Sequence, residues 1–126
     1  MASFISAFAT LPASDLARAR AFYEQTLGLQ VGQESPGGFG VLYLAGTSAV
    51  FVFASQQAGT NQTAVSFEVD DLGAMVTELR GRGVTFEEYD FPGLKTENGI
   101  AEAEGERRAW FKDSEGNMLA AIQRAA

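Results

Sequence analysis

The 126-residue chain contains no cysteine and no histidine. The lack of cysteine excludes a disulfide framework and a thiolate metal site. The lack of histidine removes the commonest metal ligand and the side chain that most often acts as an acid or base near neutral pH. Together the two absences exclude every metal site and catalytic group that depends on imidazole or thiolate.

Basic side chains are scarce as well. Nine lysines and arginines stand against 16 aspartates and glutamates, which gives a net charge of −7. Nucleic-acid binding requires a basic face, so we expect no nucleic acid as a partner. In its simplest interpretation the acidic excess favours solubility, and in a sharper one it attracts cationic ligands.

Long apolar runs are also missing. No run reaches membrane-spanning length, and residues 1–13 have neither the basic residues nor the long apolar core of a signal peptide. We therefore expect a cytoplasmic protein that does not bind membranes. At this length the chain forms one domain or two small fused modules with a core of ordinary size.

The apolar residues follow a pattern that occurs twice. In each half a strand is followed by an amphipathic helix and three further strands, which predicts a repeated β-α-β-β-β arrangement. The strands of the first half are expected at residues 4–11, 29–34, 39–44 and 49–53. Those of the second half are expected at residues 63–69, 84–89, 106–112 and 118–123.

An aspartate marks the start of each helix. Asp15 and Asp71 can cap free helix N–H groups, and the second follows the first by 56 residues. The third strands are 68 residues apart, so the second copy carries an insertion, which we expect as a loop over residues 91–105. Neither copy can bury both faces of its sheet alone, so the copies should pair.

The final hairpin is the most specific stretch. Two apolar strands flank the turn sequence Asp-Ser-Glu-Gly-Asn at residues 113–117, in which Gly116 and Asn117 tolerate positive φ. An aromatic pair and a basic residue, at positions 110–112, come directly before this turn.

This hairpin, together with Asp15, the pair Phe22-Tyr23, the run 27–29 and the pair Val69-Asp70, resembles the vicinal oxygen chelate superfamily of glyoxalases, bleomycin-resistance proteins and extradiol dioxygenases. The resemblance implies an α+β fold of two paired β-α-β-β-β modules that form a curved, cup-shaped mixed sheet. A single domain would span residues 1–126, with modules at about 1–56 and 62–126. It also implies a homodimer, and leaves open whether modules pair within one chain or across the dimer.

Metal-dependent members of the superfamily hold their ion with ligands from the first and last strands of each module. By register these positions are Phe8, Val52, Ala64 and Ala120, and none of these side chains can donate a lone pair to a metal. We therefore expect no metal and no other cofactor. The resemblance then implies a metal-free protein that binds and sequesters a compound, as family members bind bleomycin or mitomycin.

Two other functions stay open. The first is a glyoxalase-like lyase, isomerase or dioxygenase-type enzyme of the same superfamily, either metal-free through Glu68 and Tyr43 or metal-dependent through other ligands. The second is a regulatory or structural protein whose cup is filled by its own side chains. The preferred interpretation assigns no catalytic residue.

The register also predicts which residues line the cup. The expected ligand-binding residues are Phe8, Tyr43, Val52, Ala64, Ser66, Glu68, Arg108, Trp110, Met118 and Ala120. Trp110 either stacks on a ligand or packs under the loop, and Arg108 either pairs with Glu68 or a ligand anion or lies on the surface. Glu68 is either a cation partner or a solvated rim carboxylate.

An acidic run follows the second helix. It comprises Glu87, Glu88, Asp90, Glu97, Glu102, Glu104 and Glu106. The run is either a solvated edge or a lid that attracts cations to the cup. With Glu68, it leads us to expect a planar ligand that is neutral or cationic.

Overall fold

The computed structural model describes residues 5–56, 58–59, 62–103 and 105–124. The chain divides into two compact units, Met1–Ala58 (unit 1) and Gly59–Ala126 (unit 2). Their boundary falls in a polar segment rich in glutamine and threonine. Within the described ranges, no helix is both long and apolar enough to cross a membrane.

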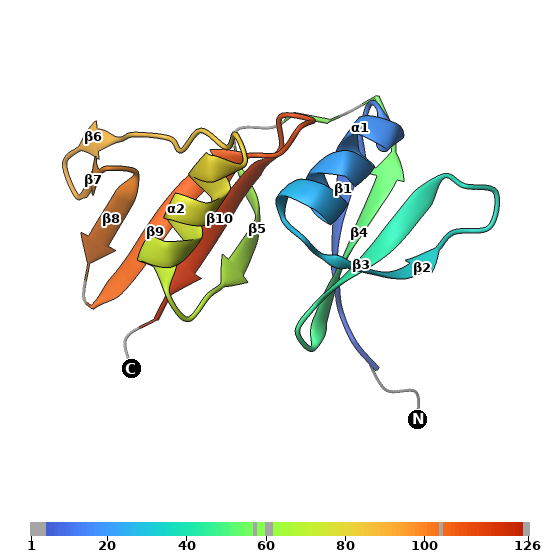
Figure 1. The fold of residues 1–126 in the computed structure, drawn as a ribbon, viewed down its shortest axis with the longest axis horizontal. Coiled ribbons are helices and arrows are strands. Elements are labelled where there is room, and N and C mark those ends of the chain that lie inside the picture. The colour runs from blue at the N-terminus through green and yellow to red at the C-terminus, as the bar shows by residue number, and fades with distance from the viewer. Residues whose placement is uncertain (1–4, 57, 60–61, 104, 125–126) are drawn as a thin grey trace. The chain divides into compact units, whose positions relative to one another are not determined.

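Unit 1 is a four-stranded sheet with a helix across one face (Figure 1). Its strands lie in the order β1-β4-β3-β2, with β1 parallel to β4 and the other neighbours antiparallel. In chain order the elements are β1 (Ala9–Ala13), α1 (Leu16–Ala21), the π-helical turn η1 (Phe22–Thr26), β2 (Gln30–Glu34), β3 (Gly40–Ala45) and β4 (Ser48–Ala54).

The helix of unit 1 begins and ends as its sequence predicts. The Asp15 side chain accepts a hydrogen bond from the Arg18 amide, which confirms the predicted N-cap. At the other end Gly28 has φ +73°, and the Leu29 amide donates to the Tyr23 carbonyl over six residues. A left-handed glycine directly after the last turn is a common ending of a helix, and here it follows the π-helical turn.

The predicted first strand was placed too early. The strand runs over Ala9–Ala13 and includes Pro12, which was expected to end it. Because β1 is at the edge of the sheet, a proline without an N–H group is tolerated there. Phe8 precedes the strand, and Phe4 lies outside the described residues.

Unit 2 is a six-stranded sheet with α2 across one face (Figure 1). The strand order is β5-β10-β9-β8-β7-β6, with β5 parallel to β10 and β9 antiparallel to it. Its elements are β5 (Thr63–Glu68), α2 (Leu72–Gly81), β6 (Asp90–Phe91), β7 (Leu94–Glu97), β8 (Ile100–Ala103), β9 (Glu106–Lys112) and β10 (Met118–Gln123). The last two strands have the predicted bounds.

Two expectations for unit 2 were wrong. Residues 84–89 form no strand, and only Phe86 bridges Phe111 of β9. Residues 91–105 are not a loop, because β6, β7 and β8 form antiparallel hairpins there. The first half of β9 pairs with β8 and the second half meets Phe86, so two separate segments together occupy the sheet position that β2 has in unit 1.

The turn between β7 and β8 explains why the insertion forms strands. Asn98 and Gly99 are its two residues, with φ of +53° and +81°, as in the tight turns that suit the twist of a hairpin. The Glu88 carboxylate accepts hydrogen bonds from the Thr96 hydroxyl (2.6 Å) and the Gly99 amide (3.0 Å). The hairpin is therefore attached to the segment that follows α2.

The turn between β9 and β10 is held by one buried carboxylate. Asp113 Oδ1 accepts from the amides of Glu115 and Asn117, both at 2.8 Å, and Oδ2 accepts from the Asn117 side chain at 2.9 Å. Gly116 has φ +84°, as the sequence predicts. The turn therefore buries its polar groups only because they bond one another.

Candidate functional site

The face of the unit 2 sheet opposite to α2 carries two cross-strand rows. Ala120 of the central strand β10 lies between Ser66 of β5 and Trp110 of β9. Two residues further on, Ile122 lies between Glu68 and Arg108. Because successive side chains of a strand point to opposite faces, these six side chains share one face.

The two rows border a hollow of about 390 Å³. It is lined by Thr63, Ser66, Glu68, Arg108, Trp110, Ala120, Ile122 and Arg124. The small side chain of Ala120 leaves room between Ser66 and Trp110. The volume lies within the range of small-molecule sites, and the lining is more polar than is usual for them, since Trp110, Ala120 and Ile122 are its apolar members.

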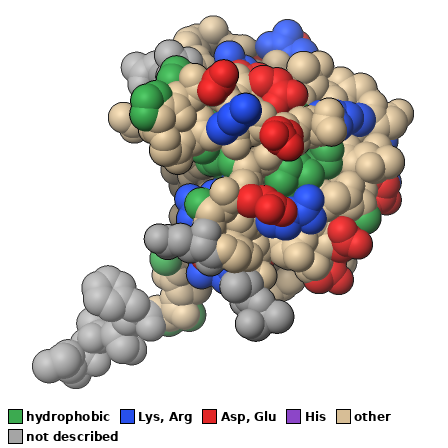
Figure 2. Space-filling model, turned by 90° about the vertical axis from the view of Figure 1, so that its left-hand side faces the viewer, with side chains coloured by type: hydrophobic (Ala, Val, Ile, Leu, Met, Phe, Trp, Pro, Cys, Tyr) green, Lys and Arg blue, Asp and Glu red, His purple; other side chains and the backbone are tan. Residues whose placement is uncertain are grey.

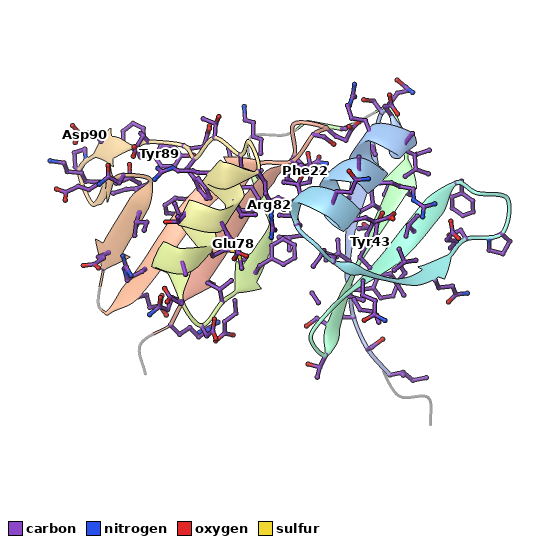
Figure 3. The ribbon with its side chains drawn as sticks, in the orientation of Figure 1. Phe22, Tyr43, Glu78, Arg82, Tyr89 and Asp90 are labelled. Carbon is purple, nitrogen blue, oxygen red and sulfur yellow. The ribbon has the colours of Figure 1, made fainter. Side chains whose placement is uncertain are left out.

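The position of Trp110 is set by its neighbours. Its carbonyl accepts from the Glu87 amide at 2.8 Å, and its ring meets that of Tyr89 edge-on, with centroids 5.5 Å apart and planes at 80°. Tyr89 directly precedes β6, next to Asp90 (Figure 3). The indole is half-buried and lines the hollow, so it can offer an aromatic surface to a ligand.

The charges at the hollow differ from those expected. Arg108 pairs with Glu106 at 2.8 Å and not with Glu68, whose carboxylate lies 3.6 Å from Arg124. The lining thus contains two guanidinium groups and one carboxylate. The argument from charge for a neutral or cationic ligand is therefore not supported at this face.

The predicted register was wrong by one residue in unit 1. Tyr43 and Val52 lie on the helix-covered face, fully buried, and the Tyr43 ring stacks on Tyr23 at 5.6 Å. Residues 49–54 are apolar at every position, so alternation of polarity could not distinguish the two faces of β4. The opposite face carries Leu42, Leu44, Phe51 and Phe53 instead.

The Tyr43 hydroxyl is engaged within unit 1. It donates to Glu24 Oε2 at 2.8 Å, and the same oxygen accepts from Arg20 Nε at 2.7 Å. Burial, with the neighbouring carboxylate, raises the pKa of Tyr43 well above its usual range. The hydrogen bond from Arg20 lowers the pKa of Glu24, and the bond from Tyr43 adds to this. Tyr43 is thus a neutral core residue and not a cup residue.

The structure brings together five of the predicted site residues, namely Ser66, Glu68, Arg108, Trp110 and Ala120. Ala64 and Met118 are not part of the lining, although alternation places both on the same face; the strand register shifts directly after Met118. Phe8 is half-exposed and lies outside the strands of unit 1. Thr63 and Arg124 were missed, and continuing the alternation of β10 past its end would have found Arg124.

The residues do not fit the metal of the superfamily's enzymes. Val52 lies in the helix-side core, and Ala64 and Ala120 present methyl groups to the open face. In the part of the chain that the structure describes, no group of three or more Asp and Glu side chains is placed to hold a metal ion. At the hollow of unit 2 the one carboxylate of the lining, Glu68, faces Arg124.

Two carboxylates of the acidic run are engaged within unit 2. Glu88 bonds Thr96 and Gly99, and Glu102 pairs with Arg107 at 3.0 Å, so these carboxylates belong to the strands and their supports. On this side of the molecule acidic side chains stand next to basic ones (Figure 2). A second hollow there, of about 460 Å³, has no aromatic residue in its lining. Glu104 lies outside the described residues.

Two β-α-β-β-β units, one of them extended by hairpins, define a small α+β protein with one open face on each sheet. Residues 5–121 match the family model described as the Glyoxalase/Bleomycin resistance protein/Dioxygenase superfamily. The chain belongs to this superfamily. A comparison with curated proteins gives no match.

Solved structures share the fold along nearly the whole chain. TnmS3, an antibiotic binding protein from Streptomyces sp. CB03234, is 21% identical with a TM-score of 0.77, and the match covers 99% of both chains. A glyoxalase/bleomycin resistance protein from the same organism is 20% identical, with a TM-score of 0.70 and coverage of 92% and 97%. A lactoylglutathione lyase from Agrobacterium tumefaciens is 20% identical, with a TM-score of 0.69 and coverage of 97% and 95%.

Proposed function

We propose that the protein binds a planar organic molecule in the hollow of unit 2 and releases it unchanged, without a metal or other cofactor. The observation that carries this proposal is the position of Trp110, whose indole borders a hollow with the small Ala120 beside it. The antibiotic-binding structural relative TnmS3 supports a binding role by analogy of fold.

Trp110 supplies the main expected contact. Stacking of a flat ring on an indole contributes about 0.5–1.5 kcal/mol beyond the burial of apolar area. We expect at least one class in a panel of aromatic antibiotics that differ in charge to change the fluorescence of Trp110, the only tryptophan. Replacing Trp110→Ala should weaken binding by roughly tenfold, at ~1.4 kcal/mol per decade.

The control for this variant is Phe39→Ala, which removes an exposed aromatic ring in unit 1 that does not line the hollow. It should leave binding unchanged. Calorimetry measures both variants, since the first one has lost its fluorophore. Equal affinity of Trp110→Ala and the wild type for a compound that binds would contradict the assignment of the site.

A second pair of variants tests the hollow without changing its polar groups. Ala120→Leu adds a branched side chain at the centre of the lining, and should abolish binding by filling the space. Ala64→Leu makes the same chemical change at an exposed position of the same sheet that is not part of the lining. Binding that survives in Ala120→Leu would place the ligand elsewhere.

The enzymatic alternative has less support. Its metal-free form used Tyr43 with Glu68, but the Tyr43 hydroxyl is buried and bonded to Glu24. Its metal-dependent form requires donors that the family's ligand positions lack. Elemental analysis should find no stoichiometric zinc, iron, nickel or manganese, and about one such ion per chain would revive this alternative.

We also propose that the chain forms a homodimer. The open face of unit 1 carries Phe39, Leu44, Phe51 and Phe53, of which Phe39 is 53% exposed. Apolar faces of this kind are commonly covered by a partner, and a two-fold dimer is the commonest assembly. Light scattering at tens of micromolar should give twice the chain mass, and a monomer mass would count against the proposal.

A further inference from the structure

The row of Glu68, Ile122 and Arg108 places charged groups in the hollow beside Trp110, and the binding of a flat ring alone does not involve them. Arg108 is two residues from Trp110 on β9, so both side chains stand on the same face, about 7 Å apart along the strand. A ring held against Trp110 therefore directs a substituent at its edge toward this row.

Within the lining the substituent meets two guanidinium groups and one carboxylate, and a second carboxylate, Glu106, lies behind Arg108. Arg108 and Arg124 both line the hollow, and Glu68 is the one carboxylate in the lining. The Arg124 Nε lies 3.6 Å from Glu68, which is longer than the roughly 2.7–2.9 Å of a charge-assisted hydrogen bond. That pair is largely exposed, and such pairs contribute little to stability.

Arg108 is suited to an anion. One of its terminal nitrogens donates to Glu106, which is not part of the lining, while its guanidinium borders the hollow. A guanidinium has five N–H donors in a planar fork that matches a carboxylate. A ligand carboxylate can therefore bond Arg108 beside Glu106 or in its place.

From this arrangement we infer that the hollow selects planar aromatic molecules that carry an acidic group, with the ring against Trp110 and the anion on Arg108. The inference rests on the proposed function of the hollow as a ligand site and adds the chemical class. It replaces the expectation of a neutral or cationic ligand. Glu68 then acts as the opposing charge that weakens binding of the anion.

Three probes that share the naphthalene ring system separate the effect of charge from that of shape: 2-naphthoate, 2-naphthamide and 2-naphthylmethylammonium. The readout is the indole N–H signal of Trp110 in a ¹H–¹⁵N spectrum, which contains a single such signal because the chain has one tryptophan. We expect 2-naphthoate to bind at least about tenfold more tightly than 2-naphthamide, and the ammonium compound to bind least tightly.

Variants assign the preference to Arg108. In Arg108→Gln the naphthoate should bind no better than the naphthamide, whose affinity should stay as in the wild type. The matched control is Lys112→Gln, which removes an exposed cation from the same strand but not from the lining. Glu68→Gln should strengthen naphthoate binding, and the dispersion of each spectrum reports whether the variant is folded.

The outcomes separate this inference from the proposed function. If all three probes shift the indole signal with equal affinity, or if Arg108→Gln keeps the preference for the acid, the inference is wrong and the binding site stands. If none of the probes shifts the signal and the antibiotics fail as well, the proposed function falls, and the ligand class falls with it.

Discussion

Replacing Asp113→Ala should destabilise the protein more than any other single carboxylate substitution in the final hairpin. Asp113 accepts three hydrogen bonds, two from backbone amides and one from the Asn117 side chain, and is 6% exposed. Each buried donor left without a partner costs about 1–3 kcal/mol. Since such losses are not additive, we expect a loss of about 3–5 kcal/mol, against a typical total of about 5–15 kcal/mol.

The isosteric variant Asp113→Asn should lose less. Its carbonyl oxygen can still accept from the amides of Glu115 and Asn117, but its new NH₂ group faces the Asn117 side-chain nitrogen, which is also a donor. Asn117 cannot turn its amide without cost, because its oxygen accepts from the Gly59 amide at 3.2 Å. We expect a loss of about 1–3 kcal/mol for this variant.

Urea unfolding followed by circular dichroism measures both losses. With a slope of about 1–3 kcal/mol per molar urea, the alanine variant should unfold at a midpoint lower by about 2 M. The control is Asp70→Ala, an exposed carboxylate before α2 that should change stability by less than about 0.5 kcal/mol. If Asp113→Ala and Asp70→Ala unfold at the same midpoint, the three hydrogen bonds do not hold the turn.

Three further predictions concern the frame of each unit. Gly40→Ala should destabilise the protein by about 1–3 kcal/mol, because the added Cβ would lie 2.5 Å from the Phe51 ring. Gly81→Ala in α2 should stabilise it by about 0.5–1 kcal/mol, because the added Cβ meets open space. Urea midpoints that move in the same direction in both variants would contradict this pair of predictions. Asp71→Ala removes the N-cap bond to the Ala74 amide and should lower the thermal midpoint through a loss of about 1 kcal/mol, and an unchanged midpoint would count against the cap. The lowered pKa of Glu24 contributes stability that is present above its unfolded pKa and is lost as the pH falls through the lowered pKa of the folded state; unfolding from pH 7 to 3 should therefore show a flatter profile in Glu24→Gln, and parallel profiles would refute the linkage.

Local signals predicted most of the fold. Asp15 and Asp71 cap their helices because a carboxylate before an apolar helical pattern has few other roles. The final hairpin was predicted with the right bounds, because the Gly116 turn separates two clearly apolar strands. The family was predicted from the order of such motifs, and the match over residues 5–121 confirms it.

Two of the failures come from the limits of hydrophobic alternation as a signal. Where both faces of a strand are apolar, as along β4, period-two alternation contains no information about which face is covered. Where strands are only four residues long, as β7 and β8 are, alternation is too short to be recognised and a hairpin resembles a loop. The pair Asn98-Gly99 was the available signal for that hairpin, since it favours a two-residue turn.

The candidate site was predictable only in unit 2. Strand β5 alternates clearly, so Ser66 and Glu68 could be assigned to one face and their partners on β9 and β10 followed. The ion-pair partners were not predictable, because the choice of Glu106 over Glu68 by Arg108 depends on side-chain conformation and not on register. Which charged side chains line the hollow, and how they are paired, could therefore be known only from the structure.

One half of β9 pairs with β8 and the other half meets Phe86, and this arrangement affects how unit 2 unfolds locally. Strands β6, β7 and β8 extend the sheet beyond β9, and each pairs with its neighbour through few residues. Segments with so few contacts unfold locally at low free energy, and their amide hydrogens exchange accordingly. Tyr89, whose ring packs against the edge of Trp110, belongs to the segment that enters these strands. When the hairpins open, β9 and β10 keep the floor of the hollow while Trp110 loses this lateral support. The proposed ligand site therefore depends on the outer strands through the contact between Tyr89 and Trp110.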